Sequence, residues 1–148
     1  MPSEYRFRSE KLELNFFSVK EAEHLKPRDT MALISLSDPE ITPEIDYDKW
    51  KHHLQLRFND VKDTEDGTVF SSQMADKIIE FVITLPEQIS YIAIHCFAGV
   101  SRSGAVIKFL SKFIYPECYN QVFDSEYIYF NRTVYSKLCK AWNKRIKK

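Results

Sequence analysis

Residues 91–110, YIAIHCFAGVSRSGAVIKFL, combine two apolar runs with a stretch of small residues between them. The first run, residues 91–94, has the length and composition of a buried central strand. The second, residues 105–110, begins an apolar helix. Between them, Cys96 is followed by five residues and then by Arg102 and Ser103. The stretch predicts a strand, a loop and a helix, with Cys96 and Arg102 at opposite ends of the loop.

This pattern suits the binding of a phosphate group. Backbone N–H groups of a short loop of small residues can converge on an anion, and the N-terminus of the next helix favours the same anion. A cysteine at the edge of such a cradle is expected to ionise to the nucleophilic thiolate. The planar guanidinium of Arg102 matches two phosphate oxygens. The loop therefore has what is needed to hold a phosphate dianion and aim a nucleophile at its phosphorus.

The surrounding sequence predicts an α/β domain. Residues 31–37 form an apolar run that ends at Asp38-Pro39, and residues 53–58 alternate between apolar and polar side chains. Residues 72–86 have helical apolar spacing, with Ser71 or Ser72 as the N-cap, and a last helix lies near the C-terminus. Strands that alternate with helices predict one domain over residues 1–148, with a mostly parallel sheet flanked by helices. Ligands of such sheets bind at the carboxyl ends of the strands, where Cys96 is expected.

The composition of the chain argues against several classes of partner and fold. The 148 residues include 21 basic and 21 acidic side chains, so the formal net charge is zero, which argues against a nucleic-acid partner. No apolar stretch approaches the roughly 20 residues that span a bilayer, so no membrane partner is expected. Three cysteines do not suggest a disulfide framework. Because a reactive thiol persists in a reducing compartment, we expect a cytoplasmic protein, and we predict a monomer.

The stretch from His95 to Gly104 resembles the signature loop of the protein tyrosine phosphatase superfamily, and residues 98–103 most resemble its dual-specificity branch. The resemblance covers roughly residue 30 to the C-terminus. It implies that Cys96 attacks phosphorus to form a phosphocysteine, that Arg102 clamps the phosphate, and that no metal or other cofactor is needed. Ser103 is expected to donate a hydrogen bond to the Cys96 sulfur. His95 is expected to orient the loop.

The resemblance also implies a general acid upstream of the loop. Members of the family place an aspartate some thirty-odd residues before the cysteine, just after a strand. Asp60 lies 36 residues before Cys96 and follows the second predicted strand, so we choose it. Asp63 is the alternative, and Asp66 comes third.

Two further segments bear on the architecture. Residues 130–138 resemble the start of the family's last helix, where Asn131 is expected to be the N-cap and to support the site. The first thirty residues match nothing in the family, although Ser18 can cap a short helix over residues 19–25.

The loop also suggests the substrate. Family members that act on inositol lipids or RNA 5′-triphosphates tend to carry Lys, His or Asn in the loop. The five residues here are uncharged: Phe97, Ala98, Gly99, Val100 and Ser101. We therefore expect these residues and Arg102 to bind a single phosphate on a phosphorylated protein or peptide. Phosphotyrosine is the expected substrate, with phosphoserine or phosphothreonine as further candidates.

Three alternatives remain open. The chain can be a phosphate-binding module with weak or no turnover, although Cys96, Arg102 and an acid candidate are all present. It can hydrolyse a lipid or nucleotide 5′-phosphate, against which the uncharged loop argues. It can also be another thiolate enzyme, such as a sulfurtransferase or an arsenate reductase, to which the Arg102-Ser103 pair and Asp60 are less suited.

Overall fold

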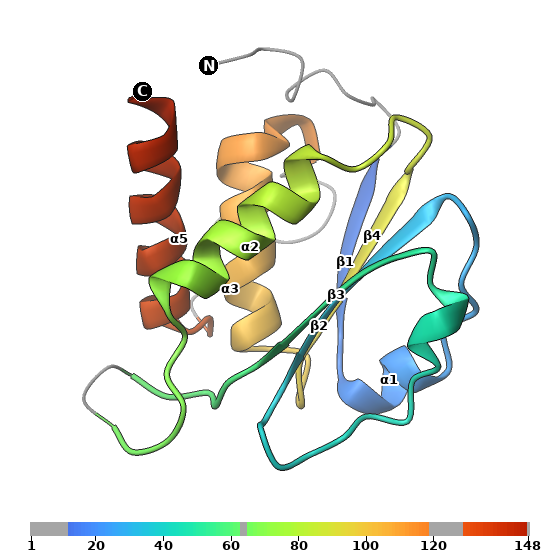
Figure 1. Ribbon diagram of the computed structural model, residues 1–148, viewed down its shortest axis with the longest axis horizontal. Coiled ribbons are helices and arrows are strands. Elements are labelled where there is room, and N and C mark those ends of the chain that lie inside the picture. Colours follow the sequence, from blue (N-terminus) through green and yellow to red (C-terminus); the bar gives the residue numbers. More distant parts are fainter. Residues whose placement is uncertain (1–11, 63–64, 119–128, 148) are drawn as a thin grey trace.

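The computed structural model describes residues 12–62, 65–118 and 129–147. Within these ranges the chain alternates between strands and helices (Figure 1). The strands are β1 (Glu13–Phe17), β2 (Met31–Ser37), β3 (His52–Arg57) and β4 (Tyr91–His95). The α-helices are α1 (Val19–Glu23), α2 (Ser72–Ile83), α3 (Arg102–Phe109) and α5 (Arg132–Ile146). Shorter helical segments are η2 (Tyr47–Lys49), the π-helix η3 (Leu110–Ile114) and η4 (Pro116–Cys118).

The four strands form one parallel sheet in the order β1-β4-β2-β3. Strand β4 therefore lies inside the sheet, paired with β1 on one side and β2 on the other, as its apolar sequence predicts. Because all four strands run the same way, their carboxyl ends meet at a single edge, at the bottom of Figure 1. The predicted α/β class with a parallel sheet and flanking helices is confirmed.

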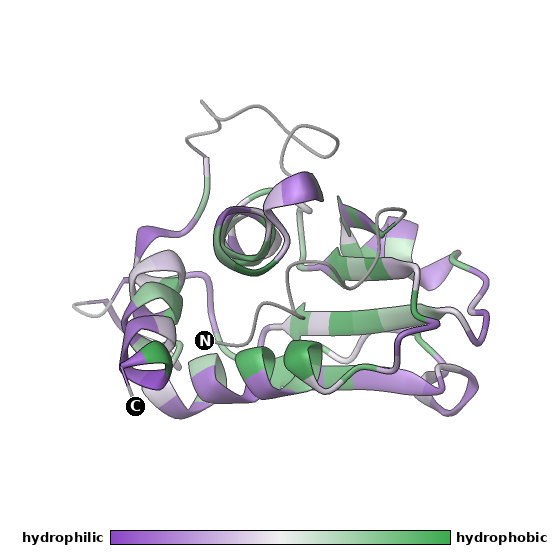
Figure 2. Ribbon diagram, turned by 90° about the horizontal axis from the view of Figure 1, so that it is seen from above, coloured by the Kyte–Doolittle hydropathy of each residue, from purple (hydrophilic) through white to green (hydrophobic). Residues whose placement is uncertain are grey.

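Each face of the sheet packs against a different layer. Side chains such as Ile34, Ile92 and Ile94 join the main core beneath α2, α3 and α5. Their neighbours in sequence, Leu33 and Ala93, point to the opposite face and join a smaller cluster with Trp50. Figure 2 shows the three long helices to one side of the sheet. The sheet is thus covered on both faces, and the edge at the strand ends is left for a site.

Helix boundaries follow from local capping. The Ser71 side chain accepts a hydrogen bond from Met74 N at 3.1 Å, which selects Ser71 over Ser72 as the N-cap of α2. Helix α2 ends at Ile83, before the predicted end, and Thr84 is its C-cap, with a hydroxyl that donates to Glu80 O at 2.7 Å. In α5, Asn131 is the N-cap, as predicted, and accepts from Val134 N at 3.0 Å.

Two further features differ from the predictions. Helix α3 begins at Arg102, three residues before the predicted start, so Arg102 and Ser103 belong to its first turn. The first thirty residues supply β1 and α1, although no strand was predicted there. The predicted capped helix is confirmed over its first five residues: Ser18 and Glu21 form a reciprocal capping box.

Candidate active site

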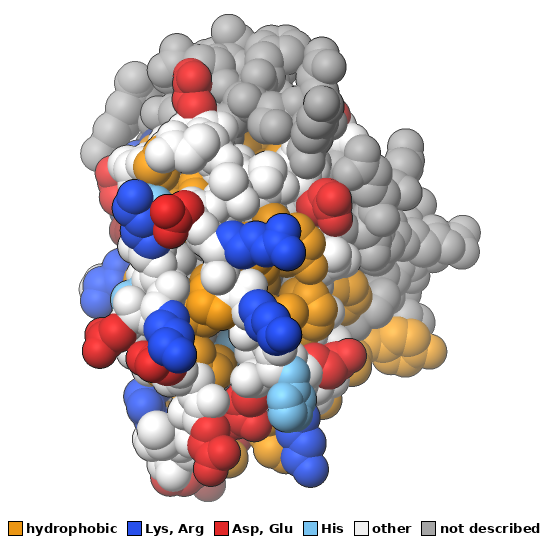
Figure 3. Space-filling view, turned by 90° about the vertical axis from the view of Figure 1, so that its right-hand side faces the viewer, with side chains coloured by type: hydrophobic (Ala, Val, Ile, Leu, Met, Phe, Trp, Pro, Cys, Tyr) orange, Lys and Arg blue, Asp and Glu red, His pale blue; other side chains and the backbone are white. Residues whose placement is uncertain are grey.

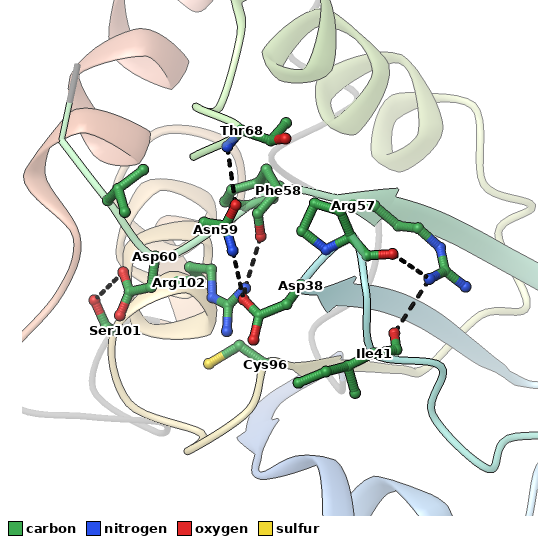
Figure 4. A network of polar contacts seen from close by, with 12 residues as sticks. Asp38, Ile41, Arg57, Phe58, Asn59, Asp60, Thr68, Cys96, Ser101 and Arg102 are labelled. Atoms are coloured by element: carbon green, nitrogen blue, oxygen red, sulfur yellow. Dashed lines mark hydrogen bonds and ion pairs between the residues drawn. The ribbon is translucent and has the colours of Figure 1, made fainter. Parts of the chain in front are cut away.

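The site is built where the four parallel strands end. Strand β2 is followed by Asp38, β3 by Phe58, Asn59 and Asp60, and β4 by Cys96. Residues far apart in sequence therefore meet at one edge, and Figure 4 shows them around Arg102. Residues 96–101, which we call loop 96–101, connect β4 to α3. This is the position at which parallel α/β sheets bind their ligands.

The backbone of β1 and α1 supports loop 96–101 from one side. Cys96 N donates to Phe17 O at 3.2 Å, and Val19 N donates to Phe97 O at 3.1 Å. Gly99 has a φ of +73°, and a Cβ added there would lie only 2.4 Å from Ser18 N. Only glycine combines this left-handed conformation with so close a backbone approach. The N-terminal elements thus help to fix the shape of the loop.

Cys96 lies at the base of the loop. Its residue surface is 2% exposed, and its Sγ is 3.1 Å from the hydroxyl of the fully buried Ser103. The hydroxyl is placed to donate a hydrogen bond to a thiolate at Sγ, as predicted for Ser103. Cys139, by contrast, is half-buried on α5, and burial raises the pKa of its thiol, which keeps that cysteine protonated.

The Arg102 guanidinium is held from the strand side. Its Nη1 donates to Asp38 Oδ1 at 2.9 Å and to the backbone oxygen of Phe58 at 2.7 Å. The arginine is 3% exposed, and its buried Nε has no hydrogen-bond partner within the described part of the chain. In Figure 4 the guanidinium faces the sulfur of Cys96. A buried N–H donor without a partner is costly, so the group is suited to receive an anion beside the cysteine.

Asp60 is joined to the loop and to the start of α5. Its Oδ1 accepts from Ser101 Oγ at 2.8 Å and from Asn131 Nδ2 at 2.7 Å. Asn131 also donates its backbone N–H to Ser101 O at 2.9 Å. The N-cap of α5 thus fixes the carboxylate and the loop together. Oδ2 of Asp60 makes no hydrogen bond to any described residue, so it is the oxygen available to a ligand.

His95 occupies a buried hydrogen-bond chain behind the loop. Its Nε2 bonds to Ser35 Oγ, which is 2.9 Å from the hydroxyl of Tyr47, and its Nδ1 is 3.4 Å from Cys96 O. Burial lowers the pKa of His95 from 6.5 to about 4, the main cause being the loss of solvation of the charged ring. A neutral ring at physiological pH suits the predicted orienting role rather than proton transfer.

A cavity of about 590 Å³ opens beside Asp60. Its walls include Lys62, Ser101, Phe130 and Asn131, from the chain after β3, the loop and the start of α5. At the loop itself, the Phe97 side chain is 59% exposed and Val100 is 39% exposed. Two apolar side chains of the loop are thus exposed to solvent.

No protein-family model matches the sequence, and no curated protein matches it. Among solved structures, one similar chain is the human tyrosine phosphatase-like serine/threonine/tyrosine-interacting protein. The two chains are 16% identical, with a TM-score of 0.54 over 78% of each chain. The chain whose sequence is printed above therefore has a tyrosine phosphatase-like fold. At this identity the likeness establishes the fold, and the chemistry must be argued from the residues of the site.

Within the tyrosine phosphatase-like fold, most of the predicted site residues lie together, but not all of them do. Cys96, Ser103, Arg102 and Asp60 meet at the carboxyl edge, together with loop 96–101, and His95 and Asn131 contact the loop from behind and from the side. Asp63 lies outside the described residues. Asp66 is exposed in the same connection as Asp60.

Sequence reasoning missed Asp38. It interpreted this residue as the end of a strand before Pro39, yet Asp38 is the ion-pair partner of Arg102, 64 residues away. It directly follows β2, and Asp60 follows β3 after two further residues, so both aspartates lie at the carboxyl ends of strands. Applying the rule that ligands bind at the carboxyl ends of parallel strands to each strand in turn would have found it.

Within residues 12–62, 65–118 and 129–147, no group of three or more His, Cys, Asp or Glu side chains is arranged to hold a metal ion. In the same ranges, no helix has both the length and the apolar character needed to cross a membrane.

Proposed function

We propose that this protein is a cysteine-dependent phosphatase that hydrolyses phosphate monoesters on proteins, with phosphotyrosine as the preferred group. The observation that carries the proposal is the buried guanidinium of Arg102 beside Cys96. The Nε of this arginine has no hydrogen-bond partner among residues 12–62, 65–118 and 129–147. Two acceptors bind the same nitrogen, Nη1, from the strand side. The guanidinium therefore keeps donors for phosphate oxygens on the side of the loop.

In the first step the Cys96 thiolate attacks phosphorus. The S–P bond forms as the ester P–O bond breaks, and the leaving oxygen takes a proton from the Asp60 carboxyl group. Arg102, the loop amides and the N-terminus of α3 stabilise the charge on the three equatorial oxygens. The hydrogen bonds of Asp60 to Ser101 and Asn131 keep the acid close to the loop.

In the second step water attacks the phosphocysteine. Asp60, now a carboxylate, takes a proton from the water, the O–P bond forms, and the S–P bond breaks to release the thiolate and inorganic phosphate. The hydroxyl of Ser103, 3.1 Å from Sγ, donates to the departing sulfur. Each group thus serves both steps, and the enzyme returns to its starting state.

The surroundings of the loop favour a protein substrate. Residues 97–101 carry no charged side chain, so this part of the loop provides no additional positive charge for a second phosphate. The exposed Phe97 and Val100 offer apolar contacts to an aromatic ring. A phenoxide also leaves more easily than an alkoxide, which favours phosphotyrosine over phosphoserine.

The test is hydrolysis of p-nitrophenyl phosphate with a thiol reductant and EDTA present, for wild type, Cys96→Ser and Cys139→Ser. Cys139 is the matched control because it is half-buried on α5. We expect vanadate-sensitive activity that is lost in Cys96→Ser and kept in Cys139→Ser. No turnover by folded wild type would overturn the proposal, and retention of phosphopeptides would then indicate a binding module.

Substrate preference needs a second comparison. Phosphotyrosine, phosphoserine and phosphothreonine peptides are tested beside a phosphoinositide and a nucleoside 5′-monophosphate. We expect the highest kcat/KM for the phosphotyrosine peptide. A higher value for the lipid or the nucleotide would replace the protein substrate while leaving the cysteine mechanism intact.

A further inference from the structure

The basic residues of the chain are concentrated at one end. Residues 132–148 include seven basic and no acidic side chains, although the chain as a whole is neutral. The rest of the chain therefore carries an excess of seven acidic residues. Figure 3, which faces the right-hand side of Figure 1, shows acidic and basic side chains interspersed on that face. The C-terminal helix α5 thus stands apart in its charge.

A groove of about 620 Å³ lies where these lysines meet α2. Lys137, Lys140 and Lys144 line it from α5, and Lys147 lines it just after the helix. Spacings of three and four residues place them on one side of the helix. The nearly buried Ala141 contributes an apolar surface, and Asp76 on α2 is the one acidic residue in the lining. Figure 2 shows α5 end-on, with hydrophilic colouring on its outer side.

Three of these lysines have no acidic partner among the described residues. Lys140, Lys144 and Lys147 are exposed and make no ion pair with any described residue. Lys137 is different because its Nζ donates to Phe70 O at 2.7 Å. Arg145, on another side of the helix, pairs with Glu80 at 3.0 Å. Like charges four residues apart repel each other along a helix, and an acidic ligand in the groove would relieve that repulsion.

We propose that the groove between α2 and α5 is a docking site for an extended acidic peptide segment of a partner protein. The charge of the lining selects an acidic ligand. A hollow between two helices, with an apolar surface beside the lysines, admits the alternating side chains of an extended peptide, whereas a bilayer or a duplex needs a flat or broad basic surface. The neutral net charge also disfavours nucleic acid.

The groove is separate from the candidate active site. Helix α5 begins next to Asn131, which contacts Asp60, and an α-helix rises 1.5 Å per residue, so Lys144 lies about 20 Å further along. Among the described residues, no ion pair joins Lys140, Lys144 or Lys147 to loop 96–101. Docking therefore does not depend on the proposed phosphatase activity. An experiment can refute either proposal without refuting the other.

The experiment measures binding of a fluorescein-labelled peptide of alternating glutamate and leucine by fluorescence anisotropy at physiological salt. The groove variant is Lys140→Gln/Lys144→Gln/Lys147→Gln. The matched control is Lys20→Gln/Lys26→Gln/Lys49→Gln, which removes three exposed lysines elsewhere. We expect the groove variant to bind about tenfold more weakly, the effect of three exposed charges of about 0.5 kcal/mol each. The control should bind like wild type.

Several results would overturn the proposal. These are no binding to wild type, equal binding to both triple variants, and equal binding of a peptide with glutamine in place of glutamate. Tighter binding to a single-stranded oligonucleotide or to phosphatidylserine vesicles would assign the groove to another class of ligand. Circular dichroism and p-nitrophenyl phosphate turnover, both expected to be unchanged in both variants, exclude misfolding as the cause.

Discussion

Asp60 is the residue on which the chemistry of the leaving group depends. We expect Asp60→Asn to lower kcat by about 10²–10⁴-fold for phenyl phosphate, because the poor leaving group then departs without a proton. The loss should be much smaller for p-nitrophenyl phosphate, whose phenoxide needs little help. Steady-state kinetics with both substrates measure the ratio.

Two variants sharpen this test. Asp66→Asn, in the same connection, should leave the ratio unchanged. Asn131→Ala removes a hydrogen bond to Asp60 at 2.7 Å and should change the ratio in the same direction but less. If Asp63→Asn rather than Asp60→Asn produces the leaving-group dependence, the acid has been misassigned.

Asp38 acts through another side chain, and its substitution should weaken anion binding. In Asp38→Asn an oxygen acceptor remains for Arg102 Nη1, but the charge that strengthens the 2.9 Å bond is lost. We expect kcat/KM to fall about tenfold, with a parallel loss of vanadate affinity. Titration with vanadate provides the measurement. Glu40→Gln, an exposed neighbour, is the control, and unchanged vanadate binding in Asp38→Asn would show that Asp38 does not position Arg102.

At the scale of elements, the contact between loop 96–101 and the β1–α1 junction is the most constrained. Gly99→Ala would place a Cβ 2.4 Å from Ser18 N and 2.5 Å from the carbonyl carbon of Phe17. Both atoms belong to backbone and cannot move aside cheaply. We expect a loss of at least about 2 kcal/mol in the free energy of unfolding, or a displaced loop without activity. Urea unfolding and p-nitrophenyl phosphate turnover distinguish the two.

Gly67→Ala is the matched control for backbone strain. Gly67 also has a positive φ, +116°, but its added Cβ would approach the side chain of Asn59 rather than backbone. We expect a loss of only about 1 kcal/mol there. A Gly99→Ala protein as stable and active as the Gly67→Ala protein would refute the proposed role of the junction.

Sequence patterns predicted the elements whose signals are local. The caps expected at Ser18, at Ser71 or Ser72, and at Asn131 each depend on residues within one turn, and the structure has N-caps at Ser18, Ser71 and Asn131. Strand β1 was not predicted: unlike the apolar run of β4, its sequence ELNFF mixes polar and apolar residues, and its pairing partner lies far along the chain. The bond between Asp38 and Arg102 has no local signal at all, since it depends on the order of the strands.

At the scale of the whole molecule, the buried His95 couples stability to pH. Its folded pKa of about 4 lies below the unfolded value of 6.5, so between these values the unfolded chain binds a proton that the folded protein does not. The free energy of unfolding therefore falls as pH drops through 6.5. Below about pH 4 the protonation of His95 causes no further decrease. From about pH 8 to about pH 5 the loss due to His95 is about 2 kcal/mol.

Urea unfolding at the two pH values measures the change. The wild type should lose about 2 kcal/mol more than His95→Asn, because the other titrating groups are common to both and cancel. In wild type, the NMR signals of the His95 ring should stay in their neutral positions down to about pH 5. A ring that protonates near its ordinary pKa would contradict both expectations.

The hydrogen bond from Val19 N to Phe97 O offers a way to detect ligand binding at loop 96–101. The first N–H groups of a helix have no partner within it, and here the amide of Val19 donates to loop 96–101 at 3.1 Å. Its hydrogen exchanges with solvent deuterium only when the loop and α1 separate. A ligand that holds the loop in place should therefore slow exchange at Val19, so one amide outside the anion cradle reports its occupancy without any measurement of turnover.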